Sequence, residues 1–435
     1  MGFRSVLLRA SRARLRYSPS PEDPRFRRSF SQLLHSEPER PSFGIAFDID
    51  GVIIRGRTTI GGSSHALRRL YHADGIAIHI LALLFYPASS RTLKVPFLFL
   101  TNGGGVPETK RSLELSELLG VPISPLQVVL GHSPFRQLVS RFENELIVAV
   151  GKGEPSLVMA EYGFKKVLSI NDYASYFNHI DPLSQYKTWS LKQSFDKNCK
   201  LSFQSKFNVH SERVKGAFVV SDPVDWGRDI QVLCDILRYG GLPGKGNGHQ
   251  PPLYFAADDL EYQAAFPCER LGMGAFRIAL ESIYNRIHSS PLEYTSYGKP
   301  NPSVFKNAES TLTKLALTTY PAKETRVSKN FAFNIIYMIG DNPKVDVNGA
   351  KKAGHPWFPI LTRTGVFKGK DNDEHFPADL VGQFTYLTVK SFDLRYAKAL
   401  SLLGFKFRTK LYAITVVDTV EEAVDFILKK ENIQS

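Results

Sequence analysis

Short apolar runs recur along this chain, and several of them end directly at a polar motif. The runs with the length of buried strands are 43–47, 95–100, 146–150 and 335–339. Helices are predicted between them, at about 63–71, at about 108–119 and around Ala350 and Ala353. Continuous apolar runs that alternate with helices predict an α/β fold with a parallel sheet covered on both faces. In such a sheet the ligand binds outside the carboxyl ends of the strands.

A second region, from about 172 to 292, has a different pattern. It contains predicted strands at 216–221 and 253–257 and predicted helices at 229–239 and 274–288. This pattern indicates a smaller α/β domain inserted into the first. The expected organisation is an N-terminal arm (1–40), the first part of a core (41–171), the inserted domain (172–292) and the second part of the core (293–435).

The N-terminal arm has the composition of an organelle-targeting peptide. Its first 36 residues contain eight Arg, no Lys and only two acids, Glu22 and Asp23. They lack the apolar segment that a secretory signal requires. Because Arg dominates over Ser and Thr, we expect a mitochondrial transit peptide. The alternatives are a plastid peptide, or a basic tail without an address on a cytoplasmic protein.

The charge of the whole chain changes this picture little. Its formal net charge is +13, of which the first 36 residues carry +6. The remainder is typical of a mildly basic enzyme with anionic substrates, and no aromatic-flanked basic stripe indicates nucleic-acid binding. No run reaches the roughly 18 apolar residues that span a bilayer, so no transmembrane segment is expected. Cys199, Cys234 and Cys268 are spaced like free thiols.

Two aspartates, Asp48 and Asp50, follow the first apolar run and precede Gly51. Two carboxylates at a strand end repel each other unless a cation lies between them. Mg²⁺ prefers oxygen ligands and commonly binds one or two carboxylates together with a substrate phosphate. A carboxylate can also act as a nucleophile and form an acyl phosphate. The pair therefore indicates Mg²⁺-dependent phosphoryl chemistry, with a solvated turn as the alternative.

Three further motifs follow other segments. Thr101 and Asn102 precede three glycines and predict a phosphate cradle, although a Gly-rich turn alone would look the same. Lys299 lies in GKPNP and can neutralise charge on a nucleophile and on a phosphoryl group, although a lone lysine is more often solvated. Asp341 and Asp346 follow the last run and are predicted to be a Mg²⁺ ligand and its support.

The segments DIDGV, TN, GKP and GDNPKVD, in this order, resemble the four motifs of the haloacid dehalogenase superfamily. The long insertion before GKPNP is similar to that of the subfamily with a C2-type cap, which includes phosphoglycolate and pyridoxal phosphate phosphatases. FDIDGVI, FLTNGGG, SDPVDWGRDIQ, GMGAF and IGDNP resemble the eukaryotic group named after the cat eye syndrome critical region protein 5. The resemblance covers roughly residues 43–380 and implies a Rossmann-like core, a C2 cap and phosphoric monoester hydrolysis.

The resemblance also implies a role for each motif residue. Asp48 would attack phosphorus in line. Asp50 would protonate the leaving oxygen and then activate water, and its backbone carbonyl would contact the metal. Asp48 and Asp341 would hold Mg²⁺, with Asp346 in support. The residues that would bind the transferring phosphoryl group are Thr101, Asn102 and Lys299.

The cap residues are predicted by the same resemblance. In related capped enzymes a glycine-containing cap loop selects the substrate, and Gly272 and Gly274 match that loop. Asp222, Asp225 and Trp226 are further candidates, with ordinary cap packing as the alternative for all five. The oligomeric state stays open, and a homodimer is one candidate assembly because C2 caps often join in dimer contacts.

Two segments depart from the resemblance. Asp48 and Thr101 lie 53 residues apart, farther than in the similar family, and the surplus falls near 75–91. A second surplus, at about 382–415, precedes a final strand and helix predicted from Val417 onward. We interpret both as translated retained introns, with lineage-specific loops as the alternative. An apolar insertion just before Thr101 could disturb the site.

These observations favour a phosphatase that acts on a small phosphorylated metabolite. One alternative is a role in glycerophospholipid biosynthesis, on a lipid-precursor phosphate, although the chain lacks the signature of CDP-alcohol transferases. Another is a non-catalytic interaction protein on a hydrolase scaffold. The presence together of Asp48, Asp50, Lys299 and Asp341 argues against a scaffold, which has no need of them.

Overall fold

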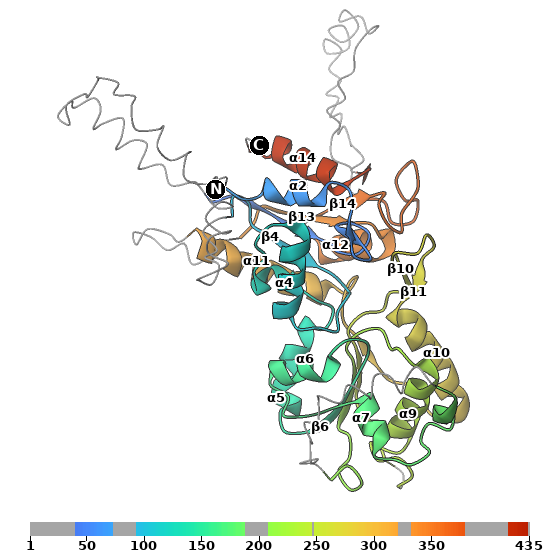
Figure 1. Cartoon of the computed structure of the whole chain (residues 1–435). Coiled ribbons are helices and arrows are strands. Elements are labelled where there is room, and N and C mark those ends of the chain that lie inside the picture. The colour runs from blue at the N-terminus through green and yellow to red at the C-terminus, as the bar shows by residue number, and fades with distance from the viewer. Residues whose placement is uncertain are drawn as a thin grey trace, which may run out of the picture. The chain divides into compact units, whose positions relative to one another are not determined.

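The computed structural model describes residues 40–72, 93–187, 208–245, 248–320, 332–378 and 416–433 (Figure 1). The predicted targeting arm, apart from Arg40, lies outside the described residues. The two surplus segments, near 75–91 and at about 382–415, lie outside them as well. The described residues from Ser42 onward belong to one unit.

A six-stranded sheet forms the first layer of this unit. Its strands are β1 (Phe43–Phe47), β4 (Phe97–Leu100), β5 (Val128–Val129), β13 (Ile335–Gly340), β14 (Trp357–Thr362) and β15 (Val416–Val417). Their order is β15-β14-β13-β1-β4-β5, and every pairing is parallel. The order reverses between β1 and β13, which is the switch point where doubly wound sheets form a ligand crevice. The prediction of a Rossmann-like α/β fold is confirmed.

Helices on this sheet follow from apolar faces and caps in the sequence. The helices are α2 (Ser63–Arg68), α4 (Glu108–Leu119), α11 (Pro302–Thr319), α12 (Asn348–Ala353) and α14 (Val420–Lys430). The α14 helix begins at Thr419, whose hydroxyl accepts the Glu422 N–H at 3.2 Å, while the Glu422 carboxylate accepts the Asp418 N–H at 3.0 Å. Figure 1 shows α14 beside α2, and ion pairs from His65 and Arg69 to acids of α14 join them.

A second sheet of five strands is also wholly parallel. Its strands are β6 (Leu146–Val150), β7 (Lys166–Ser169), β8 (Gly216–Val219), β9 (Leu253–Phe255) and β12 (Thr295–Ser296), in the order β12-β9-β8-β6-β7. Its helices are α5 (Val139–Phe142), α6 (Pro155–Tyr162), α7 (Ile170–Ser175), α9 (Trp226–Arg238) and α10 (Met273–Ile287). It has its own apolar core, separate from that of the first sheet.

Shorter elements complete the described segments. Two hairpins pair β2 (Ile54–Arg55) with β3 (Thr58–Thr59) and β10 (Glu261–Tyr262) with β11 (Arg270–Leu271). The short turns of helix are at Pro125–Gln127, Ser133–Leu138, Ser184–Tyr186 and Pro343–Val347. None of the helices in these segments is long and apolar enough to cross a membrane.

The sheet to which β6 belongs differs from the prediction. The strand 146–150 exists, but it pairs with β7 and β8 of the second sheet rather than with the core. The predicted boundary at residue 172 is therefore too late, and β12 extends the second sheet beyond 292. The physical reason is that a strand buried on both faces is continuously apolar in either sheet, so periodicity does not assign it to one of them.

Most other elements lie where the sequence predicts them. The strand 43–47, the helix 108–119 and the final strand and helix after 416 are confirmed. The helix predicted to end at Tyr71 ends at Arg68, and the strand predicted from Val95 begins at Phe97. Such shifts of two or three residues are usual at element ends.

Candidate active site

The carboxyl ends of both sheets carry polar side chains that line one cavity. From the six-stranded sheet, Asp48 and Asp50 follow β1, Thr101 and Asn102 follow β4, and Asp341 follows β13. From the five-stranded sheet, Lys152 follows β6, Asp222 follows β8, Asp259 follows β9 and Lys299 follows β12. Asp346 and Gly272 line the same cavity. Of the predicted site residues, Gly274, Asp225 and Trp226 are not among those that line it.

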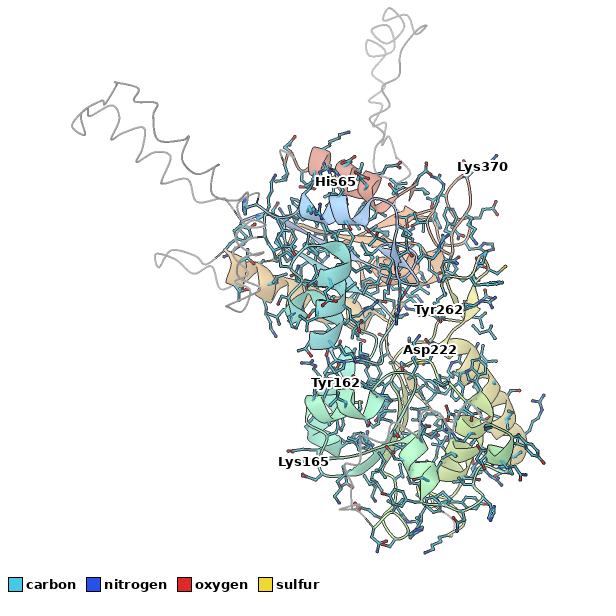
Figure 2. All side chains as sticks on the ribbon, viewed as in Figure 1. His65, Tyr162, Lys165, Asp222, Tyr262 and Lys370 are labelled. Carbon is cyan, nitrogen blue, oxygen red and sulfur yellow. The ribbon has the colours of Figure 1, made fainter. Side chains whose placement is uncertain are left out.

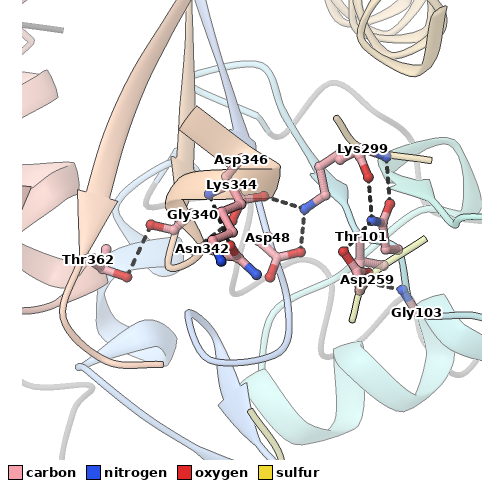
Figure 3. Close-up of polar contacts among 11 residues, drawn as sticks. Asp48, Thr101, Gly103, Asp259, Lys299, Gly340, Asn342, Lys344, Asp346 and Thr362 are labelled. Atoms are coloured by element: carbon pink, nitrogen blue, oxygen red, sulfur yellow. Dashed lines mark hydrogen bonds and ion pairs between the residues drawn. The ribbon is translucent and has the colours of Figure 1, made fainter. Parts of the chain in front are cut away.

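Lys299 lies buried between two aspartates (Figure 3). Its Nζ donates to Asp48 Oδ1 at 2.7 Å and to Asp346 Oδ1 at 2.6 Å. Burial lowers the pKa of Lys299, but the Asp346 and Asp48 carboxylates outweigh it and raise that pKa above its usual value. The ammonium is therefore charged, and its two ion pairs hold it beside the predicted nucleophile.

Three carboxylates gather around this ammonium. Oxygens of Asp48, Asp341 and Asp346 lie within 4.8 Å of one another. Burial raises the pKa of Asp48 well above its usual value, Lys299 opposes that shift, and the two neighbouring acids reinforce it. Burial and then Asp346 also raise the pKa of Asp341. Three buried acids against one ammonium leave surplus negative charge, which is the electrostatic setting of a cation site.

Asp341 is held in a narrow space between two glycines. A Cβ at Gly51, whose φ is +87°, would lie 2.5 Å from Asp341 Oδ2, and a Cβ at Gly365 would lie 1.8 Å from it. The Val366 N–H donates to the same oxygen at 2.6 Å. The sequence reasoning did not find Gly365, because it lies beyond the fourth motif and only the fold brings it to the carboxylate.

Asn102 connects the two sheets through its side-chain amide. Its Nδ2 donates to the Lys299 carbonyl at 2.8 Å and to Asp259 Oδ1 at 3.0 Å, and its Oδ1 accepts the Lys299 N–H at 2.7 Å. Gly298, with φ +73°, permits this approach, since a Cβ there would lie 2.7 Å from Asn102 Oδ1. The amide is therefore occupied in positioning Lys299. The predicted contact of Asn102 with phosphate stays a prediction.

Thr101 keeps a donor for the cavity. Its Oγ1 accepts the Gly103 N–H at 3.0 Å, and the side chain is almost fully buried. A hydroxyl can accept one hydrogen bond and donate another. Its proton therefore stays able to reach a phosphoryl oxygen, and the contact itself stays a prediction.

Asp50 lies beside cations from both sheets. Burial raises the pKa of Asp50, whereas Arg111 and Lys152 lower it and Asp222 reinforces the rise. The Lys152 ammonium pairs with Asp222 Oδ2 at 2.7 Å and lies 5.6 Å from the centre of the Tyr262 ring. Asp222 and Tyr262 are labelled in Figure 2. A raised carboxyl pKa suits a group that donates a proton near neutral pH.

The sequence reasoning also missed Lys152 and Asp259. Burial raises the pKa of Asp259 to about 7, and its hydrogen bond with Asn102 opposes that shift. A signal was present, since Asp259 follows an apolar strand as Asp48 does. It was not informative alone, because an acid after a strand is also common in a simple turn.

Gly272 and Gly274 lie at the start of α10. The Gly272 N–H donates to the Leu260 carbonyl at 2.9 Å and the Gly274 N–H to the Asp259 carbonyl at 2.8 Å. A Cβ at Gly272 would lie 2.5 Å from the Asp259 carbonyl oxygen, and one at Gly274 would lie 2.4 Å from that of Asp258. The glycines thus let α10 approach the loop that carries Asp259. Only Gly272 also lines the cavity.

Trp226 makes the contacts of a packing residue. Its Nε1 donates to the Pro223 carbonyl at 3.1 Å, and its ring packs edge-on against Phe276 at 5.5 Å. Asp225 caps α9 by accepting the Arg228 N–H at 3.3 Å. These are the packing roles that the alternative interpretation describes, whereas Asp222 faces the cavity.

The fold and the site together define a Rossmann-like α/β protein with an acid-rich centre at its switch point. Two family models match the sequence, a haloacid dehalogenase-like hydrolase over residues 45–165 and an HAD-hydrolase-like family over residues 296–386. The chain belongs to the haloacid dehalogenase-like hydrolases.

Two curated relatives come from yeasts. The chain is 29% identical over 370 residues to a mitochondrial hydrolase of Saccharomyces cerevisiae. This match covers 81% of this chain and 96% of the relative. It is 31% identical over 344 residues to a fusion protein of Schizosaccharomyces pombe that joins a cardiolipin synthase (CMP-forming) to a mitochondrial hydrolase. That match covers 77% of this chain and 50% of the fusion protein.

A solved structure with a similar fold is a glycerol phosphate phosphatase of Mycobacterium tuberculosis in complex with calcium. The sequence identity is 16% and the TM-score is 0.44, with 74% of this chain and 66% of that chain covered.

Proposed function

We propose that this hydrolase is a Mg²⁺-dependent phosphatase that acts on a small phosphorylated compound through a phosphoaspartate on Asp48. The observation that carries the proposal is Lys299, which pairs with Asp48 inside a cluster of three buried carboxylates. A nucleophile, a proton donor and a phosphate-binding cation are the groups that a carboxylate-based phosphoryl transfer requires.

The acid cluster fits a divalent cation. Asp48 and Asp341 offer oxygen ligands, while both carboxylate oxygens of Asp346 are engaged, one by Lys299 and the other by the Asn342 N–H at 3.0 Å. Asp346 therefore supports the site. When bound, Mg²⁺ would neutralise charge on the phosphoryl oxygens and lower the repulsion between them and Asp48.

The protein groups divide the reaction between them. Asp48 attacks phosphorus, so the Asp48–phosphorus bond forms while the bond to the leaving oxygen breaks. Asp50 gives its proton to that oxygen. Asp50 then takes a proton from water, whose oxygen attacks phosphorus and releases inorganic phosphate and the Asp48 carboxylate. Thr101 and Lys299 bind the phosphoryl oxygens throughout.

A phosphate-release assay tests this proposal. Purified full-length protein with Mg²⁺ is offered a panel of phosphorylated metabolites, in parallel with Asp48→Asn. The expected result is release from some member of the panel by the wild type and none by Asp48→Asn. Asp371→Asn, a change of an exposed aspartate, is the matched control and should retain activity.

A second readout separates this mechanism from other hydrolysis. Protein quenched with acid during turnover should carry a covalent phosphoryl group, and Asp48→Asn should not. If the panel shows no Asp48-dependent release, the proposal fails.

We also propose that the protein acts in mitochondria. The Arg-rich first 36 residues and the names of both yeast relatives support this location. Fusion of residues 1–40 to a fluorescent protein should direct it to mitochondria. Fluorescence spread through the cytoplasm would contradict the proposal.

A lipid-precursor phosphate is the second candidate substrate. It is favoured by the Schizosaccharomyces pombe relative, in which a similar segment is fused to a cardiolipin synthase. Lipid profiling of a null mutant distinguishes the two. Accumulation of a phosphorylated lipid precursor would favour the lipid, and an unchanged lipid profile would favour the soluble metabolite.

A further inference from the structure

A second cavity meets the active site at Asp50. Asp50, Thr101, Gly103 and Lys152 line both cavities. The second one continues away from Lys299, between α4 and the turn that carries Lys152, and we call it the α4 groove. Neither Asp48 nor Lys299 lines it.

Asp50 fixes which part of a substrate can enter the α4 groove. A proton donor must lie within hydrogen-bond reach of the oxygen that it protonates. The transferring phosphoryl group lies at Asp48 and Lys299, so the leaving oxygen lies at Asp50. The carbon skeleton attached to that oxygen must then continue beyond Asp50, and the α4 groove is a space that begins there.

Charged side chains of both signs line the groove, with Asp50, Glu114 and Glu117 as the acids and cations from three elements. Arg57 lies in the turn between β2 and β3, Arg111 lies on α4, and Lys152 follows β6. The Arg111 Nη1 atom pairs with Glu114 Oε2 at 3.1 Å, so the other guanidinium N–H groups can still donate to a ligand. Lys152 likewise gives one of three ammonium protons to Asp222.

Leucine side chains also line the groove. Leu115 and Leu130 are buried in the wall, and Leu118 of α4 is 37% exposed. The partly exposed Leu118 side chain can pack against the methylene groups of a chain-like ligand.

We propose that the α4 groove is the leaving-group subsite and that it accepts phosphomonoesters whose leaving group carries a second anionic group at the end of a short carbon chain. The inference rests on the proposed function. Arg111 and Lys152 would bind that second anion, because both line the groove that begins at Asp50 and both keep N–H donors for a ligand. A soluble acidic metabolite and a phosphorylated lipid headgroup share this chemistry.

Two probes of equal chain length test the inference on the full-length protein with Mg²⁺. Butyl phosphate offers one phosphomonoester and no second charge. 4-Phosphonobutyl phosphate adds a phosphonate whose C–P bond this chemistry does not cleave, so each probe releases one phosphate. We expect the wild type to prefer the phosphonate by about tenfold or more in kcat/KM, as one charge-assisted contact provides.

Two arginine variants complete the test. Arg111→Met should lose most of this preference, whereas Arg286→Met, at an exposed arginine of α10 that lines neither cavity, should retain it. Equal kcat/KM for the two probes with wild type would overturn the inference, as would an unchanged preference in Arg111→Met. No Asp48-dependent hydrolysis of either probe would instead refute the proposed function itself.

A third probe distinguishes the two sources of the second anion. It is a diacyl lipid with an internal phosphodiester and a terminal phosphomonoester, presented in detergent micelles. Faster hydrolysis of the lipid than of 4-phosphonobutyl phosphate would indicate that the α4 groove binds a lipid headgroup. The reverse order would indicate that it binds a soluble metabolite. Arg111→Met must weaken whichever reaction is faster, and failure to do so would count against the subsite.

Discussion

The two parallel sheets contribute opposite charges to one site. The six-stranded sheet presents Asp48, Asp50 and Asp341 at its carboxyl ends. The five-stranded sheet presents Lys152 and, in the connection from β12 to α11, Lys299. Burial and then the neighbouring acids raise the pKa values of Asp48 and Asp341, so the first sheet alone would concentrate unfavourable negative charge. Charge balance is reached only where the two sheets meet.

The contrast is not complete, since the second sheet also contributes acids. Asp222 pairs with Lys152, and Asp259 accepts from Asn102. The partner of Asp222 comes from the five-stranded sheet and that of Asp259 from the six-stranded sheet, and neither acid belongs to the carboxylate cluster around Asp48. The difference teaches that the second sheet does more than cover the cavity, because it supplies the cation that the predicted nucleophile requires.

Removal of that cation should have the largest effect. Lys299→Met deletes the ammonium that pairs with Asp48 and Asp346, so the phosphoryl group loses a fixed positive charge. We expect kcat to fall by about 10³-fold. Steady-state kinetics on the best substrate of the panel measure it. Lys370→Met, at an exposed position labelled in Figure 2, should change kcat by less than about twofold, and a similar loss there would point to a general effect of charge.

The acid side of the comparison is tested at Gly365. A Cβ there would lie 1.8 Å from Asp341 Oδ2, so Gly365→Ala must displace that carboxylate. We expect the Mg²⁺ concentration for half-maximal activity to rise by about tenfold to a hundredfold. Gly227→Ala is the control, because a Cβ there meets only Asp225 Oδ1, at 3.8 Å. An unchanged Mg²⁺ requirement in Gly365→Ala would show that Asp341 is not a ligand.

The sequence predicts much of the acid side of this site. Asp48 and Asp341 follow apolar runs, and the carboxyl ends of parallel strands meet at one edge of a sheet. The sequence pattern therefore predicts that Asp48 and Asp341 lie close together. The start of α14 can be predicted from the sequence as well, because the hydrogen bonds of Thr419 and Glu422 are local and need no tertiary contact.

The residues that the five-stranded sheet contributes to the site are harder to predict from the sequence. Leu146–Val150 is apolar throughout, so its pattern does not reveal that β6 brings Lys152 from a second sheet. Asp259 contacts a residue 157 positions away, and the role of Asn102 depends on the same contact. Such contacts are set by how the sheets pack, which local periodicity does not encode.

A buried histidine connects the two regions and gives a pH test. His132 Nδ1 lies 2.7 Å from the hydroxyl of Tyr162 on α6, and that hydroxyl donates to Glu108 of α4 at 2.6 Å. Burial lowers the pKa of His132 to about 4, so the folded protein keeps the ring neutral as the pH falls. The unfolded chain binds that proton below about pH 6.5. Stability is therefore present above about pH 6.5 and is lost toward pH 4.

Chemical denaturation at two pH values measures this linkage. Between about pH 7.5 and about pH 5, the wild type should lose about 2 kcal/mol more unfolding free energy than His132→Gln, whose amide can still reach Tyr162. His249→Gln, at an exposed histidine, is the control and should lose the same unfolding free energy as the wild type. Equal pH dependence of wild type and His132→Gln would contradict the linkage.

The smallest effect on the reaction is expected at Trp226. The sequence pattern offers it as a substrate contact, but its indole N–H donates to Pro223 and its ring packs on Phe276 inside the second sheet's own layer. Trp226→Phe should therefore lower the unfolding free energy by about 1 kcal/mol, through the lost hydrogen bond, and leave kcat/KM within about twofold. Asp222→Asn is the contrasting change, because that side chain lines the cavity and holds Lys152. A tenfold loss of kcat/KM in Trp226→Phe at unchanged stability would show that Trp226 acts in substrate binding. Part of substrate recognition would then lie deeper in the five-stranded sheet's layer than the cavity-lining residues indicate.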